Sequence, residues 1–314
     1  MSFAFSDIPD QTGRTAVVTC ANSGIGYEIA RHLALKGARV LLACRNAERG
    51  GEALDRIARN APGADLSLVE LDLADLDSVC RAAQVIGKEA RLDTLVNNAG
   101  LSMPPLGHGI AGTELQFSVY YLGHFALTGL LLGKLTENGG GRVVSQSSND
   151  HRRGRIDFDN LDAHQGYERR KFYAQSKLAI LLFALELDRR LRAANSPVVS
   201  LGVHPGVAAT GLLRHLGPLR ALKPVFAMVF NDAEHGALPA LQAATDPYAE
   251  GGEYLGPRGF MEMRGETSGC AAVTEPARDW QAARTLWDRS VALTGIEVDL
   301  PVSTRAMPSG SLAR

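Results

Sequence analysis

A tyrosine and a lysine lie one helical turn apart in the second half of the chain and form a pair suited to proton chemistry. They are Tyr173 and Lys177, and their spacing places both side chains on one face of a helix. Reduction of a carbonyl by a hydride requires a proton donor at the developing alkoxide. A free tyrosine titrates near pH ~10, so its surroundings must tune it for this task at neutral pH. The alternative is an ordinary pair on a solvated helix face.

A glycine-containing turn between a strand and a helix forms a candidate phosphate site. The first apolar run leads into the sequence TCANSGIG over 19–26, and an amphipathic helical pattern follows at once. In such a turn, backbone N–H groups and the positive end of the helix meet a pyrophosphate. Gly24 and Gly26 suit it because a Cβ would block the close approach of a phosphate or a strand. A plain strand-to-helix turn is the alternative.

The end of the second predicted strand indicates which dinucleotide is bound. The sequence there is ACRN over 43–46, with no carboxylate before Glu48. An acid at this point holds the ribose hydroxyls of NAD, whereas Arg45 suits a 2′-phosphate, so we predict NADP(H). The alternative for Arg45 is a solvated surface role. Asp72, after the third strand, is placed either to meet the adenine amine or to cap the next helix.

Short β-branched runs alternate with longer helical patterns through the first two thirds of the chain. This alternation implies right-handed crossovers and a parallel sheet covered on both faces. We predict an α/β fold with a Rossmann-type doubly wound parallel sheet, as a single domain over 1–314 with its core at about 12–295. A small apolar substrate-binding lobe is expected over about 208–231. The predicted strands are 14–20, 38–44, 66–72, 92–98, 141–148 and 197–204, and the predicted helices are 24–36, 46–60, 75–89, 113–137 and 168–194.

Composition argues against several classes of protein. The formal net charge is -1, which provides no field to attract nucleic acid or an anionic membrane. The 4 cysteines lie far apart, and no cluster of His, Cys, Asp or Glu has metal-ligand spacing. The chain shows neither a signal-peptide pattern nor an apolar run of the roughly 18 to 20 residues that span a bilayer. These features predict a cytoplasmic protein with no metal and no membrane span.

Several motifs occur in an order and at a spacing that resemble the short-chain dehydrogenase/reductase family, in particular its retinol-dehydrogenase and protochlorophyllide-reductase-like branch. The resemblance covers about 12–295. It implies an NADP(H)-dependent oxidoreductase, a ketone or aldehyde reductase or an alcohol dehydrogenase, in which Tyr173 is the acid or base. The motifs are the glycine turn, LDL (71–73), NNAG (97–100), LGHFALT (122–128), SS (147–148), YAQSK (173–177) and HPGVAAT (204–210).

The resemblance also implies roles for individual residues. Lys177 would lower the pKa of Tyr173 and hydrogen-bond the nicotinamide ribose, and Ser148, rather than its neighbour Ser147, would polarise the substrate carbonyl. The predicted cofactor-binding residues are Thr19, Cys20, Asn22, Ser23, Gly24, Ile25, Gly26, Arg45, Asp72, Leu73, Asn98, Ala99, Gly100, Tyr173, Lys177, Pro205, Gly206, Val207 and Thr210.

Two positions depart from the family pattern. Cys20 stands where the family has the first glycine of the turn, and we expect binding to survive there if its φ stays negative. Tyr120 stands at the position of a catalytic asparagine, which in the family holds a water of a proton relay that a tyrosine cannot place identically. Either activity is retained or the reaction is slow or altered. The alternative function is therefore a cofactor-binding or non-redox biosynthetic protein, against which Ser148, Tyr173 and Lys177 argue.

Two apolar regions bear on partners. The region 208–231 favours a small lipophilic carbonyl or alcohol substrate; packing on the core and a membrane-interface helix are the alternatives, and Pro218 and Pro224 disfavour the second. The helical patterns over 113–135 and 174–191 look too apolar to face water on two sides. In the family that the sequence resembles, such helices form the dimer face, so the resemblance implies a homodimer.

Overall fold

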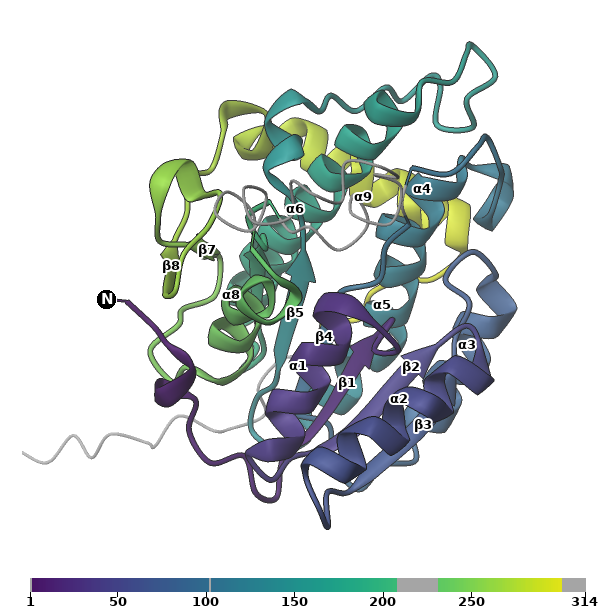
Figure 1. The fold of residues 1–314 in the computed structure, drawn as a ribbon. Coiled ribbons are helices and arrows are strands. Elements are labelled where there is room, and N and C mark those ends of the chain that lie inside the picture. Colours follow the sequence, from purple (N-terminus) through teal and green to yellow (C-terminus); the bar gives the residue numbers. More distant parts are fainter. Residues whose placement is uncertain (1, 102, 208–230, 301–314) are drawn as a thin grey trace, which may run out of the picture.

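The predicted strands pair into one sheet in the computed structural model of the protein (Figure 1). The structure describes residues 2–101, 103–207 and 231–300, so the predicted substrate lobe lies almost wholly outside the described residues. The strand order is β3-β2-β1-β4-β5-β6-β7-β8, and among the strands of the described residues only the β7–β8 pair is antiparallel. This confirms the Rossmann-type α/β fold. The strands are β1 (Thr15–Thr19), β2 (Arg39–Cys44), β3 (Leu66–Glu70), β4 (Thr94–Asn97), β5 (Arg142–Gln146), β6 (Val199–Val203), β7 (Tyr254–Pro257) and β8 (Ser268–Cys270).

Helices cover both faces of the sheet because successive strand residues point to opposite faces. The helices are α1 (Gly24–Leu35), α2 (Ala47–Asn60), α3 (Leu76–Ile86), α4 (Leu115–Phe117), α5 (Gly123–Thr136), α6 (Arg169–Ala193), α8 (Ala233–Thr245) and α9 (Trp280–Thr294), with a π-helical turn (Ser118–Leu122) joining α4 to α5. Val17 and Leu41 pack with α3, α5 and α6, whereas their neighbours Val18 and Leu42 pack with α1, α2 and α8.

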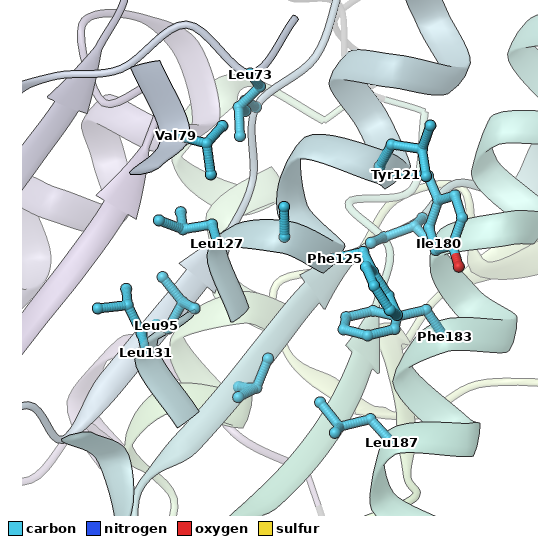
Figure 2. Close-up of a cluster of buried hydrophobic side chains, with 14 of the residues drawn as sticks. Leu73, Val79, Leu95, Tyr121, Phe125, Leu127, Leu131, Ile180, Phe183 and Leu187 are labelled. Carbon is cyan, nitrogen blue, oxygen red and sulfur yellow. The ribbon is translucent and has the colours of Figure 1, made fainter. Parts of the chain in front are cut away.

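The last helix, α9, covers α5 and α6 on the side away from the sheet. Its Trp287 ring lies 5.3 Å from the ring of Phe125 and 6.0 Å from that of Phe183. The Tyr121 hydroxyl lies 2.6 Å from the Ser290 hydroxyl on α9. Figure 2 shows Tyr121, Phe125 and Phe183 gathered in this buried cluster. The chain's own helix thus accounts for the apolar character on which the homodimer prediction was based, and the homodimer itself stays a prediction.

Candidate active site

The predicted site residues that the structure describes gather at the carboxyl end of the sheet. Thr19 ends β1, Asn98 follows β4, Ser148 follows β5 and Pro205 follows β6. The order of strands along the chain reverses between β1 and β4, and ligands of doubly wound sheets bind at such a switch point. Thr210 lies outside the described residues.

The glycine turn leaves space where a pyrophosphate could approach the backbone. A Cβ on Gly26 would lie 2.5 Å from the carbonyl oxygen of Cys20 and 2.4 Å from the amide nitrogen of Asn98, so no larger residue fits there. Gly24 has a φ of +58°, which favours glycine. The side chain of Ser23 precedes α1 without capping it, so it does not occupy the N–H groups of the first helical turn. The turn therefore fits a dinucleotide phosphate.

Cys20 adopts the conformation of the glycine that it replaces. Its φ is +56°, so the condition under which we expected binding to survive, a negative φ, is not met: the strand-to-helix connection sets the backbone, and the side chain tolerates it. Burial raises the pKa of the Cys20 thiol, and the nearby positive charge of Arg45 lowers it. Burial also raises the pKa of Cys44 to about 11. Both thiols are therefore poor thiolates, which argues against a redox-sensitive pair.

Replacing Cys20 should separate the cost of this conformation from the loss of the sulfur atom. We expect Cys20→Gly to unfold with a free energy about 0.5–1 kcal/mol above that of Cys20→Ala. The left-handed region costs a residue with a Cβ about 1–2 kcal/mol, and the more flexible unfolded chain of the glycine variant offsets part of that. Urea unfolding measures both variants. Equal values would show that the side chain carries no strain at this position.

Thr19 joins the glycine turn to the next strand and to α5. Its hydroxyl accepts hydrogen bonds of 2.9 Å from the N–H groups of Asn98 and Ala99, and the Asn98 amide donates to the Thr19 carbonyl at 2.9 Å. The same hydroxyl lies 3.0 Å from Nε2 of His124, whose Nδ1 lies 3.0 Å from the Tyr120 carbonyl. Because a carbonyl only accepts, Nδ1 donates and Nε2 accepts. Burial lowers the pKa of His124 to about 4, so the ring is neutral at pH 7. His124 lies in the LGHFALT motif, but its link to Thr19 depends on the fold and could not be predicted from the sequence.

Two predicted cofactor contacts lie at the ends of β2 and β3. Arg45 is exposed directly after β2, so its guanidinium is available to a ligand. The Asp72 carboxylate accepts a hydrogen bond from the N–H of Ala74 at 2.9 Å, while Asp75 is the residue that caps α3. The helix-cap alternative for Asp72 is therefore wrong.

Ser148 and Tyr173 come together above β5. Burial raises the pKa of the Tyr173 phenol overall, and the nearby Ser148 hydroxyl opposes part of that rise. Ser147 points elsewhere, since its hydroxyl donates to the carbonyl of Lys177 at 2.6 Å and is buried. The neighbouring serine thus has a structural contact, and Ser148 is the one beside the tyrosine.

Lys177 is buried next to two aromatic rings. Its ammonium lies 4.1 Å from the ring centre of Tyr120 and 5.9 Å from that of Tyr173, and it donates a 3.0 Å hydrogen bond to the carbonyl of Gln146. Burial lowers the pKa of Lys177 to about 7. A partly neutral lysine lowers the pKa of a neighbouring phenol less than a full cation does. The expected lowering at Tyr173 therefore does not offset burial in this structure.

Tyr120 is fixed by both the donor and the acceptor capacity of its hydroxyl. The hydroxyl donates to the carbonyl of Leu101 and accepts a 2.9 Å hydrogen bond from the N–H of the same residue. A Cβ on Gly100 would lie 2.4 Å from the Tyr120 ring, so a glycine is required beside it. The ring also meets that of Tyr173 edge to face, with 5.6 Å between centres. The Tyr120 ring is thus held in one position beside the ammonium of Lys177.

The loop after β6 is held by a distant part of the chain. Asn231 donates a 2.9 Å hydrogen bond to the carbonyl of Pro205, and the N–H of Val207 donates to the carbonyl of Met263 at 2.9 Å. Gly206 has a φ of +72°, and a Cβ on it would lie 2.4 Å from the Met263 carbonyl oxygen. The segment around Met263 was not identified from the sequence, because its contact with this loop depends on the fold.

One cluster in the described part of the chain combines metal-ligand types, at Glu28, His32 and Glu234. The guanidinium of Arg31 donates to Glu28 at 2.7 Å and to Glu234 at 2.6 Å. A permanent cation is therefore already paired with both carboxylates, and we read the cluster as an ion-pair network between α1 and α8.

Comparison with known proteins gives concordant matches. The family model described as short chain dehydrogenase matches residues 14–220. Retinol dehydrogenase 11 from Homo sapiens is 38% identical over 288 residues, which cover 91% of this chain and 87% of that protein. A crystal structure of an uncharacterised protein from Mycobacterium Paratuberculosis is 38% identical, covers 96% of this chain and 100% of that one, and has a TM-score of 0.80. The RhlG/NADP active-site complex from Pseudomonas aeruginosa is 26% identical, covers 77% of this chain and 94% of its own, and has a TM-score of 0.62.

These relatives correct the predicted location. Retinol dehydrogenases of the matched kind are membrane-associated enzymes, so the prediction of a cytoplasmic protein is wrong. The predicted location rested mainly on the lack of a leader pattern and of a spanning run in the sequence, and attachment to a membrane surface requires neither. Among the described residues, one helical stretch, Leu115–Thr136, is long and apolar enough to cross a membrane; 83% of its apolar window is buried inside the protein, as in a core helix.

Proposed function

Because this chain belongs to the short-chain dehydrogenase family, in its retinol-dehydrogenase-like branch, we propose that it interconverts a carbonyl and an alcohol on a small lipophilic substrate with NADP(H). Family membership makes it an oxidoreductase. The observation that carries the finer proposal is the placement of the Ser148 hydroxyl near enough to the Tyr173 phenol to oppose part of the rise in its pKa that burial causes, with Lys177 one turn further along α6. The test is oxidation of NADPH by purified protein with retinal and other apolar aldehydes and ketones. A folded protein that binds cofactor but turns over none of them would contradict it.

The proposed chemistry assigns a distinct task to each side chain. When bound at the glycine turn, the nicotinamide cofactor would supply or accept the hydride. The Tyr173 phenol would exchange a proton at the substrate oxygen, and the Ser148 hydroxyl beside it would hold that oxygen. Lys177, with a pKa of about 7, would hold or release a proton near neutral pH. Tyr120 has no free donor, so we assign it packing against Lys177 rather than proton transfer.

The proposed choice of NADP(H) rests on Arg45. It is the exposed residue directly after β2, no acid precedes Glu48, and its charge opposes part of the rise in the pKa of Cys20 that burial causes, so its charge acts on the glycine turn. An arginine in this place suits a 2′-phosphate. The related RhlG structure is a complex with NADP, which agrees with this choice.

Removal of Arg45 should erase the preference between the two cofactors. We expect wild-type protein to bind NADPH more tightly than NADH, and Arg45→Ala to weaken NADPH binding about 10-fold while changing NADH binding little. Titration followed by nicotinamide fluorescence measures both constants. Arg59→Ala is the matched control, because Arg59 lies in the last turn of α2, about 18 Å along the helix from its first residue, Ala47, near Arg45. Equal losses for both cofactors would contradict the assignment.

A lipophilic substrate is supported by two independent facts. The relatives at 38% identity are retinol dehydrogenases, named for an apolar isoprenoid alcohol. The sequence over 208–231 is rich in leucine, valine and phenylalanine and follows the loop of Pro205 and Gly206.

A cofactor-binding protein without redox turnover is the second candidate function. The specific observations in its favour are the left-handed Cys20 in the phosphate turn and Tyr120 against Lys177. Binding of NADPH with no turnover on any apolar carbonyl would favour it over the enzyme.

A further inference from the structure

Glu262 lies in a strained turn next to the proposed site. Met261 has a φ of +51° and Glu262 a φ of +55°, so two consecutive residues with side chains occupy the left-handed region. Such residues persist only where their surroundings hold them in place, and they concentrate at functional positions. The Phe260 and Met261 side chains are 84% and 67% exposed, while Glu262 turns inward.

The Glu262 carboxylate joins three separate segments. One oxygen accepts a 3.0 Å hydrogen bond from the N–H of Ala272. The other accepts a 2.6 Å hydrogen bond from Arg152, in the turn that directly follows Ser148. That same oxygen lies 3.4 Å from Nε2 of His204, the first residue after β6. The main-chain carbonyl of Glu262 also accepts a 3.3 Å hydrogen bond from Asn149.

The orientation of His204 completes the connection. Its ring is fully buried, and Nδ1 accepts a 3.2 Å hydrogen bond from the N–H of Gly206. The hydrogen of the neutral ring is therefore on Nε2, the atom that faces the Glu262 carboxylate. Glu262 is thus linked through His204 to the loop that we propose contacts nicotinamide. Through Arg152 it is linked to the turn that follows Ser148, the serine proposed to hold the substrate oxygen.

We propose that Glu262 is a positioning residue that holds the turn after Ser148 and the 204–207 loop at a fixed separation. The inference rests on the proposed function, in which Ser148 holds the substrate oxygen and the loop contacts the nicotinamide half of the cofactor. Reactants held in the wrong relative position lose rate steeply, so the connection bears on turnover and on the nicotinamide contacts. The adenosine half binds on the other side of the site, at Arg45 and the glycine turn.

The test compares a whole cofactor with one that lacks nicotinamide. Glu262→Gln removes the charge that joins the segments, and Arg152→Gln breaks the same connection without altering the strained turn. We expect each variant to lower kcat about 10- to 100-fold and to weaken NADPH binding several-fold, with binding of 2′,5′-ADP unchanged. The double variant should cost no more than either single one, since both remove one connection. Glu266→Gln and Arg153→Gln, exposed neighbours of the two residues, are the controls.

Three outcomes would overturn the inference. Equal weakening of NADPH and 2′,5′-ADP would indicate a general loss of structure, additive effects in the double variant would show that the residues act separately, and unchanged kcat would remove the positioning role. Wild-type protein that binds neither NADPH nor NADH would be a different failure, since it contradicts the proposed function and removes the premise of the inference.

Discussion

Tyr173→Phe should lower kcat by about 10²- to 10⁴-fold while leaving NADPH affinity within a few-fold of wild type. General acid–base catalysis by a positioned side chain contributes on this scale, and phenylalanine keeps the ring but removes the proton. The edge-to-face contact with Tyr120 survives the change, so the helix around position 173 should stay in place. Steady-state kinetics with an apolar aldehyde and a fluorescence titration with NADPH give the two quantities.

The matched control is Tyr248→Phe, which removes the same hydroxyl from a side chain that is 76% exposed. We expect it to leave kcat unchanged. A Tyr173→Phe variant that retains more than a tenth of wild-type kcat would transfer the acid–base role to another group and remove the main support of the proposed mechanism.

Lys177→Met should abolish most turnover and at the same time stabilise the protein without cofactor. In the described structure the buried ammonium contacts one carbonyl and two aromatic rings, which compensate incompletely for its lost hydration. Methionine fills a similar volume with no charge to bury. We expect kcat to fall by at least about 10²-fold, because the proton-holding group beside Tyr173 is lost.

The stabilisation should depend on pH in a direction fixed by the pKa of Lys177. Burial lowers that pKa from 10.5 to about 7, so between these values the unfolded chain binds more protons than the folded one. Wild-type stability therefore gains up to about 1.4 kcal/mol per pH unit from this residue as pH rises through the window. The advantage of Lys177→Met should be largest below pH 7 and vanish near pH 10.5.

Urea unfolding of both proteins at pH 6, 8 and 10 tests this dependence, with the exposed Lys88→Met as the control. A stability difference that stays constant with pH would show that Lys177 keeps its ordinary pKa, and its proposed exchange of a proton near neutral pH would then have no basis.

The first six strands could be predicted because each is a short β-branched run between helical patterns. No helix or strand was predicted after residue 231, because the sequence patterns of the elements there are weaker. β7 reads YLGP, β8 is only three residues long, and α8 contains Pro239 in its interior. These elements form because the sheet and the helices already present bury them, and tertiary contacts of that kind leave little trace in a local pattern.

The residues of the candidate site likewise divide into those that the sequence could predict and those that it could not. Spacing placed Tyr173 and Lys177 on one helix face, and the end of β5 brought Ser148 beside the tyrosine. Spacing could not show that Lys177 lies nearer to the Tyr120 ring than to that of Tyr173, since this depends on how α6 packs on the turn before α5. Nor could it find Glu262, which meets Arg152 across 110 residues of sequence.

The position of α9 also has a consequence for how the chain is made. Phe125 and Phe183 are covered by Trp287, and 101 residues separate the end of α6 from the end of α9. At synthesis rates of about 5–20 residues per second, a nascent chain would display this aromatic surface for about 5–20 seconds before its cover emerges from the ribosome. During that interval the surface is open to chaperones and to other nascent chains, so ribosome-bound chains arrested before residue 280 should be the ones most prone to aggregate.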